Sequence, residues 1–126
     1  MEKIIVEVGW CNRNFGVTFS SNVPGAIVVT AKTYDELLKE IPETLKFHVE
    51  GMVADGDYEI SYHLDAAALI HSCERYASLA AISRASGVNE RLLSHYANGI
   101  KTPRAKQRMR IVEGIHKIGR TLLNIS

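Results

Sequence analysis

The chain has 126 residues, of which 46% are hydrophobic and 23% charged, so it can bury the core of one domain or two small ones and is not disordered overall. It has no signal-peptide pattern and no apolar run long enough to span a membrane, which predicts a cytoplasmic protein. Cys11 and Cys73 belong to no metal-binding pattern, so we expect reduced thiols and neither a cofactor nor a metal.

Charge is divided unevenly between the two halves of the chain. The formal net charge is +1, but residues 1–64 contain five Lys/Arg and ten Asp/Glu, giving −5. Residues 65–126 contain ten Lys/Arg and four Asp/Glu, giving +6. A basic domain is typical of phosphate binding, whereas an acidic one is either ordinary solvated surface or a surface for a basic partner. The sequence therefore predicts two domains, 1–64 and 65–126.

Alternating residues in the first half predict strands. In residues 4–10 apolar side chains recur at every second position, with Ile5, Glu7 and Gly9 between them. Residues 15–19 alternate again after the turn-forming segment 12–14, which indicates a hairpin. The β-branched run 26–31 predicts a third strand, and residues 58–64 predict a fourth.

A helix is predicted between the third and fourth strands. Thr33 and Glu36 have the spacing of a capping box, and Pro42 predicts a kink or a restarted first turn. The apolar face of this helix would consist of Leu37, Leu38, Ile41, Leu45, Val49 and Met52. The expected fold class is thus an α+β domain of order β-β-β-α-β, with a turn at Asp55-Gly56 before the last strand, followed by an all-α domain.

The second half carries a helix-turn-helix pattern. One helix opens at Ser78 and ends at Gly87, a residue that tolerates the positive φ of a tight corner. Val88 would fill the angle between the helices, and Asn89 is a good N-cap for the next helix. In that helix the apolar positions recur at helical spacing: Leu92, Leu93 and Tyr96.

Further helices flank this pair. A helix over 66–76, capped by Asp65, would supply Leu69, Ile70 and Cys73 to the core. Asn98-Gly99 stops the second helix of the pair, and Thr102-Pro103 starts another with the proline at its first position. That last helix has an apolar stripe that serves core packing or self-association: Ile111, Ile115, Ile118 and Leu122.

The second helix of such a pair can enter the major groove of DNA. We expect Arg91, Ser94 and His95 to contact bases, with Asn89 and Glu90 beside them at the start of the helix. Lys101, Thr102 and Arg104 would contact phosphates. One such unit covers little DNA, so we expect a homodimer or higher homo-oligomer on a palindromic operator, with half-sites about 34 Å apart or a multiple of that.

The helical pair resembles the Cro/repressor-type family. The resemblance rests on Ile82-Ser83, Gly87-Val88, Leu93, Tyr96 and Asn98-Gly99. It implies sequence-specific binding to operator DNA. Ser83 stands where that family often has alanine.

The two halves together resemble HicB-type antitoxins. The resemblance rests on the hairpin, Phe19-Ser20-Ser21-Asn22-Val23-Pro24-Gly25, the following strand and the helix start Thr33-Tyr34-Asp35-Glu36-Leu37-Leu38. It implies a partial RNase H-like domain without nuclease activity. It also implies an antitoxin of a type II toxin–antitoxin pair that binds and blocks a HicA-like ribonuclease toxin and represses its own operon.

An enzyme is not expected. Two-metal phosphodiester cleavage needs several carboxylates at strand ends, and the predicted strands offer only Glu7 and Glu59. Two other interpretations stay open. The chain is a stand-alone transcription regulator whose first domain senses a ligand, or a protein-interaction module whose helical domain does not bind DNA.

Overall fold

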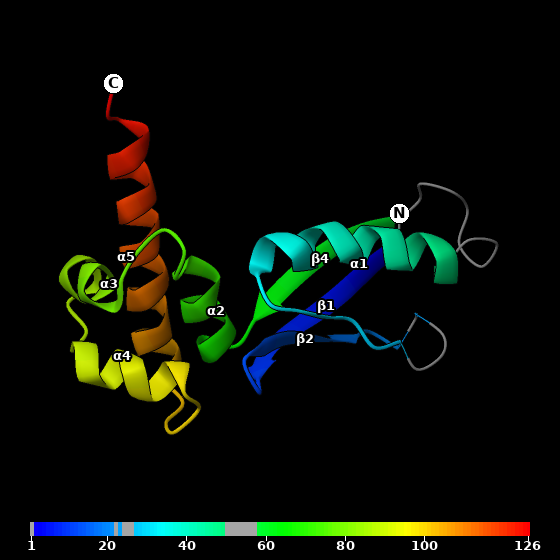
Figure 1. Ribbon diagram of the computed structural model, residues 1–126, viewed down its shortest axis with the longest axis horizontal. Helices are drawn as coiled ribbons and strands as arrows, with labels where there is room; N and C mark the ends of the chain where they lie inside the picture. The colour runs from blue at the N-terminus through cyan, green and yellow to red at the C-terminus, as the bar shows by residue number, and fades with distance from the viewer. Residues whose placement is uncertain (1, 22, 24–26, 50–57) are drawn as a thin grey trace. The chain divides into compact units, whose positions relative to one another are not determined.

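The computed structural model describes residues 2–21, 23, 27–49 and 58–126 (Figure 1). The chain forms two compact units, Met1–Asp65 and Ala66–Ser126. The first unit contains a four-stranded sheet and one helix, and the second contains helices. The mixed α+β class expected from the sequence is therefore confirmed. The predictions made for Asn22, Pro24, Gly25, Met52 and Asp55-Gly56, and for Ala26 at the start of the third strand, lie outside the described residues.

The sheet consists of β1 (Glu2–Cys11), β2 (Asn14–Phe19), β3 (Thr30–Ala31) and β4 (Tyr58–Leu64), in the order β3-β2-β1-β4. β1 pairs antiparallel with β2 and parallel with β4. Asn12 and Arg13 join β1 to β2 with φ values of 53° and 64°, as in the tight two-residue turns whose twist matches a hairpin. The expected third strand is shorter than predicted, because only Thr30 and Ala31 find partners on β2.

Helix α1 (Tyr34–Val49) covers one face of this sheet (Figure 1). It begins as predicted, because the Thr33 hydroxyl accepts a hydrogen bond of 3.2 Å from the Glu36 backbone N–H. Leu37, Ile41 and Leu45 are fully buried. They pack in one core with the inward residues of the strands, which include Ile4, Val6, Val8 and Phe15.

Two details of α1 differ from expectation. The helix continues through Pro42 without restarting. Pro42 lies on the exposed side, where water can reach the Leu38 carbonyl that loses its backbone donor. The periodicity predicts Leu38 on the buried face, but its side chain is 37% exposed, because it lies beside the stripe formed by Leu37, Ile41 and Leu45.

The second unit contains α2 (Ala66–Cys73), α3 (Leu79–Ser86), α4 (Glu90–Ala97) and α5 (Ala105–Leu123). Its core contains Ile70, Ile82, Val88, Leu93, Tyr96, Ala97 and Ile111, with Leu69 and Cys73 packed against them. Helical periodicity predicts Leu93, Tyr96 and Ile111 among these, whereas it gives no indication for Ala97.

Two helix ends in this unit differ from the sequence prediction. Helix α2 stops at Cys73 and not at Tyr76, because its end tightens into a turn in which the Glu74 N–H donates to the His71 carbonyl at 3.3 Å. Helix α5 begins at Ala105, so Pro103 is not its first residue. The reason is the backbone of Arg104, which is extended at φ −70° and ψ 160°.

Helices α3 and α5 approach closely at Gly114. A Cβ on this buried glycine would lie 2.7 Å from the Cβ and 2.9 Å from the Cα of Ser86. These are backbone and first side-chain atoms, which cannot rotate away. Gly119, on the same helix, has no atom within 4 Å of its Cβ position.

We therefore expect Gly114→Ala to destabilise the second unit by about 1–3 kcal/mol, the usual range for overpacking a core. Gly119→Ala is the matched control and should raise stability by up to about 1 kcal/mol, because alanine favours a helix over glycine. Urea denaturation followed by circular dichroism measures both. Equal effects of the two substitutions would contradict the close approach.

Candidate nucleic-acid interface

The corner between α3 and α4 is capped on both sides. The Ser78 hydroxyl accepts from the Ala81 N–H at 3.1 Å and starts α3. Gly87 ends that helix with a left-handed φ of 75°. The Asn89 side chain then accepts from the Arg91 N–H at 2.8 Å, which confirms Asn89 as the N-cap of α4.

Two serines of α3 hold the corner together. The Ser83 hydroxyl donates to the Val88 carbonyl at 2.6 Å. The Ser86 hydroxyl donates to the Ile82 carbonyl at 2.6 Å and accepts from the Val88 N–H at 3.2 Å. Val88 itself is 2% exposed, as expected for a residue that fills the angle between two helices. Both polar groups of the Val88 backbone are thus bonded by side chains of α3, which fixes where α4 begins.

The residues expected to contact bases differ in exposure. Asn89, Glu90 and Arg91 are exposed at the start of α4. Ser94 and His95 are half-buried further along the helix. The Nδ1 atom of His95 is buried and has no hydrogen-bond partner among the residues that the structure describes.

The residues expected to contact phosphates lie in the segment that joins α4 to α5. Lys101, Thr102 and Arg104 are exposed. The Ile100 and Lys101 N–H groups donate to the His95 carbonyl at 2.9 and 3.4 Å, so this segment is tied to the last turn of α4. The expected DNA-binding residues therefore form two groups, one with Arg91 in the first turn of α4 and one with Lys101 after its last turn. The length of this eight-residue helix, about 12 Å, separates them.

Arg110 is a further exposed cation close to this corner. Its Nη2 atom lies 3.1 Å from the position that a Cβ on Gly87 would take. The exposed Arg110 side chain of α5 therefore reaches the corner between α3 and α4. No sequence signal pointed to it, because a basic residue in a basic helix is indistinguishable from ordinary solvated surface.

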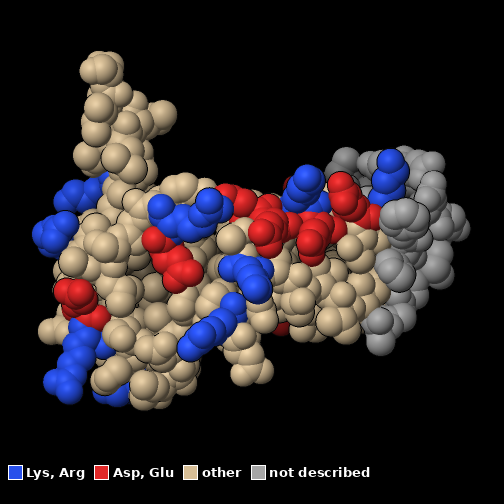
Figure 2. All heavy atoms as spheres, in the orientation of Figure 1, with Lys and Arg blue, Asp and Glu red and all other residues tan. Residues whose placement is uncertain are grey.

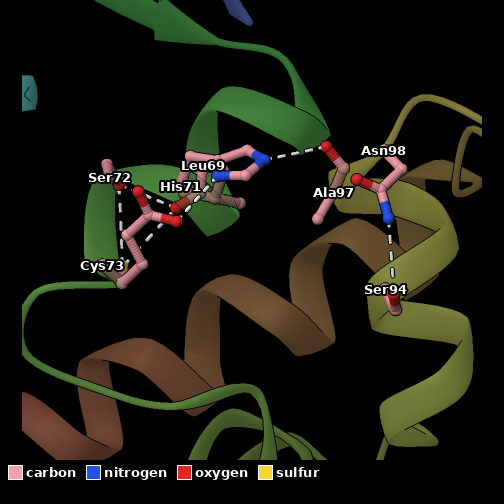
Figure 3. A network of polar contacts seen from close by, with 8 residues as sticks. Leu69, His71, Ser72, Cys73, Ser94, Ala97 and Asn98 are labelled. Carbon is pink, nitrogen blue, oxygen red and sulfur yellow. Dashed lines mark hydrogen bonds and ion pairs between the residues drawn. The ribbon is translucent and has the colours of Figure 1, made fainter. Parts of the chain in front are cut away.

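His71 fixes the other end of α4 (Figure 3). Its Nε2 atom lies 2.9 Å from the Ala97 carbonyl, and its Nδ1 atom lies 2.9 Å from the Glu74 carboxylate. Both partners are acceptors, so only the doubly protonated ring donates to both. The Asn98 side chain, beside Ala97, donates to the Ser94 hydroxyl at 3.4 Å.

Other chemistry is sparse in the described part of the chain. Within it, no group of three or more His, Cys, Asp or Glu side chains could hold a metal ion. Burial raises the pKa of the Cys73 thiol, although the hydrogen bond to Ser72 acts in the opposite direction, so little thiolate forms near neutral pH. Cys11 is exposed. None of the described helices is both long and apolar enough to cross a membrane.

Comparison with known proteins found no matching family model, no similar curated protein and no similar solved structure.

The contact between His71 and Ala97 should stabilise the second unit. We expect His71→Ala to cost about 1–3 kcal/mol, because the carbonyl of the buried residue Ala97 loses its donor. Glu74→Ala is the control: it removes only the partly exposed pair and should cost less than about 1 kcal/mol. Chemical denaturation of both variants is the measurement. A larger loss for Glu74→Ala would show that the ion pair, and not the carbonyl contact, is the important one.

Proposed function

We propose that this protein is a cytoplasmic antitoxin that binds and occludes a small basic ribonuclease toxin of the HicA type and represses its own operon. It acts by binding and carries out no catalysis. The observation that carries the proposal is the capped corner between α3 and α4, which presents Arg91 at the exposed start of α4 in the basic half of the chain.

DNA binding is supported by the geometry of this corner. We propose that α3 and α4 are a helix-turn-helix of the Cro/repressor type and that α4 enters the major groove. Its exposed first turn would then face base edges. Lys101 and Arg104, at the far end of α4 and the start of α5, would contact the phosphates of the same groove. A homodimer on a palindromic operator would double this surface.

Toxin binding is supported by the charge of the first unit and by its order of elements, β1-β2-β3-α1-β4. This order is the one that the resemblance to HicB antitoxins implies, and we propose that the unit is a partial RNase H-like domain. Figure 2 shows acidic side chains gathered over α1 in this view. The exposed acidic residues of that helix are Asp35, Glu36, Glu40 and Glu43. A protein that cleaves RNA needs a basic surface, to which this helix is complementary.

One observation favours the alternative of a ligand-sensing regulator. The face of the sheet opposite α1 has a hollow of about 840 Å³, a size typical of small-molecule sites. Its lining includes the paired glycines Gly9 and Gly16. No atom lies within 4 Å of a Cβ position on Gly16, whereas the Asp65 carboxylate lies 3.1 Å from that of Gly9. Operator affinity that changes when metabolites are added to the purified protein would support this function.

The DNA-binding surface can be tested with two substitutions. Arg91→Ala should weaken binding to DNA from upstream of its own gene by about 1–3 kcal/mol while leaving random duplex nearly unaffected. Lys101→Ala should weaken both and reduce the salt slope by about one. Lys46→Ala, an exposed position on α1, is the control and should change neither. Fluorescence anisotropy across a salt series measures all three. Equal losses of Arg91→Ala on specific and random DNA would remove Arg91 from the base-contacting residues.

The antitoxin activity can be tested with residues 1–65. The fragment ends at Asp65 because the Asp65 N–H donates to the Val8 carbonyl at 2.9 Å. We expect it to bind and inhibit the product of the adjacent gene without the second domain. Replacing Glu40 and Glu43 together with lysine should slow association about tenfold at low salt, because electrostatic steering is lost. Glu7→Lys, on the opposite face of the sheet, is the control.

Growth rescue by co-expression and binding kinetics give the readouts. If the adjacent product is toxic and the folded fragment neither binds it nor restores growth, the antitoxin proposal is wrong. The ligand-sensing regulator would then be the better account. If Glu7→Lys slows association as much as the α1 variant, the toxin contacts the opposite face of the sheet.

A further inference from the structure

The two edges of the sheet are protected very differently. β3 forms one edge and is two residues long, so it offers little backbone for pairing. β4 forms the other edge and is seven residues long, with no strand beside it among the described residues. Proteins usually protect such edges with lysine, proline, a bulge or a very short strand. The sequence of β4, YEISYHL, contains neither lysine nor proline.

The outward-facing backbone groups of β4 can be identified from one hydrogen bond. The Asp65 N–H donates to the Val8 carbonyl on β1 at 2.9 Å. Successive residues of a strand direct their N–H and C=O groups to opposite edges. Residues 59, 61 and 63 therefore direct these groups toward β1, whereas Ile60 and Tyr62 direct theirs toward the open edge.

Two copies of β4 have complementary side chains when they are aligned antiparallel with Ser61 at the centre. In an antiparallel pair centred there, Ile60 lies opposite Tyr62 of the second copy, and each such pair exchanges two backbone hydrogen bonds. Ile60 and Tyr62 are both half-buried on the face covered by α1. Pairs of aromatic and β-branched side chains are favourable across strands.

Charge complementarity selects the same register on the other face. There Glu59 would lie opposite His63 of the second copy, and an imidazole can donate a hydrogen bond to a carboxylate. Within one copy, β1 places Lys3 beside Glu59 and Glu7 beside His63. The row across both sheets is then Lys3, Glu59, His63 and Glu7, in which each carboxylate lies beside a side chain that can donate a hydrogen bond to it.

Other registers fit less well. Opposed side chains of an antiparallel pair must point to the same face of the sheet, and neighbouring residues of one strand do not. A two-fold axis perpendicular to the sheet therefore has to place one residue of β4 opposite the same residue of the second copy. Centring on Ile60 or Tyr62 leaves part of the strand unpaired. Centring on Ile60 also places Glu59 opposite Ser61, and centring on Tyr62 places His63 opposite Ser61. Neither register brings Glu59 and His63 together.

We propose that two copies of this chain pair antiparallel through β4 about a two-fold axis at Ser61, so that their sheets become continuous. The occupant of the open edge is thus a second copy of the same strand. This pairing goes beyond the proposed function and does not depend on it. It would bring two DNA-binding units into one assembly. Cross-links within β4 report on this pairing without requiring DNA or toxin, and a homodimer that forms through another surface would still fit the proposed DNA binding.

Cysteine cross-linking of the full-length chain tests the register. Cys11 is exposed and is first replaced by serine, whereas Cys73 is half-buried. Ser61→Cys should form a covalent dimer under mild oxidation. Ser61 and its copy would be a non-hydrogen-bonded pair of the antiparallel ladder, and the Cα atoms of such a pair lie about 4.5 Å apart, within disulfide range. Glu59→Cys alone and His63→Cys alone should not, since each lies about 14 Å from its own copy. An equimolar mixture of those two variants should cross-link.

The pattern of cross-linked products can support the pairing or overturn it. Cross-linking of the folded protein at Ser61→Cys and in the mixture, with none in the two single variants, supports the pairing. No product at Ser61→Cys, or equal product at all three positions, overturns it.

Hydrogen exchange on the unmodified protein gives a second measurement that needs no variant. The N–H groups of Ile60 and Tyr62 should become protected as concentration rises and light scattering shows the dimer. Those of residues 59, 61 and 63 should be protected throughout by β1. Exchange of Ile60 and Tyr62 that stays unprotected at every concentration, or a protein that remains a monomer throughout, would contradict the proposal.

Discussion

The second domain depends on one constraint, the contact between the backbones of α3 and α5 at Gly114. No side chain separates the helices there, so the end of α3 has a single position against α5. The left-handed residue Gly87 follows Ser86 directly, and α4 starts at Glu90. The direction of α4, and therefore the exposure of Arg91, follows from a contact inside the domain and not from the surface residues themselves.

Both ends of α4 are then fixed by polar side chains from other helices. Ser83 of α3 bonds to the Val88 carbonyl just before the helix, and His71 of α2 bonds to the Ala97 carbonyl at its end. A helix held in this way loses little conformational freedom when it binds a ligand. The segment with Lys101 is attached to the same helix through the His95 carbonyl, so the two groups of the proposed interface are linked by backbone bonds.

The sequence predicted what depends on neighbouring residues. Thr33, Gly87 and Asn89 were identified because caps and left-handed turns are local, and the burial of Leu93 and Ile111 followed from helical periodicity. Contacts between distant segments were missed. Neither Gly114 against Ser86 nor His71 against Ala97 has a signal in the order of residues, because each depends on how helices pack. The length of β3 was overestimated for the same reason: a β-branched run forms a strand only where a partner strand reaches it.

The parallel pairing of β1 with β4 also affects how the chain is synthesised and folds. Glu2, the first residue of β1, lies opposite Tyr58, the first residue of β4, which is the last strand of the unit. On the ribosome β1 therefore has only its hairpin partner until nearly the whole unit has emerged, and its second edge stays open in the meantime. The helices of the second unit make contacts between segments that are closer in the chain, which favours faster folding. The first unit is thus the slower one and the part of the nascent chain most exposed to misassociation.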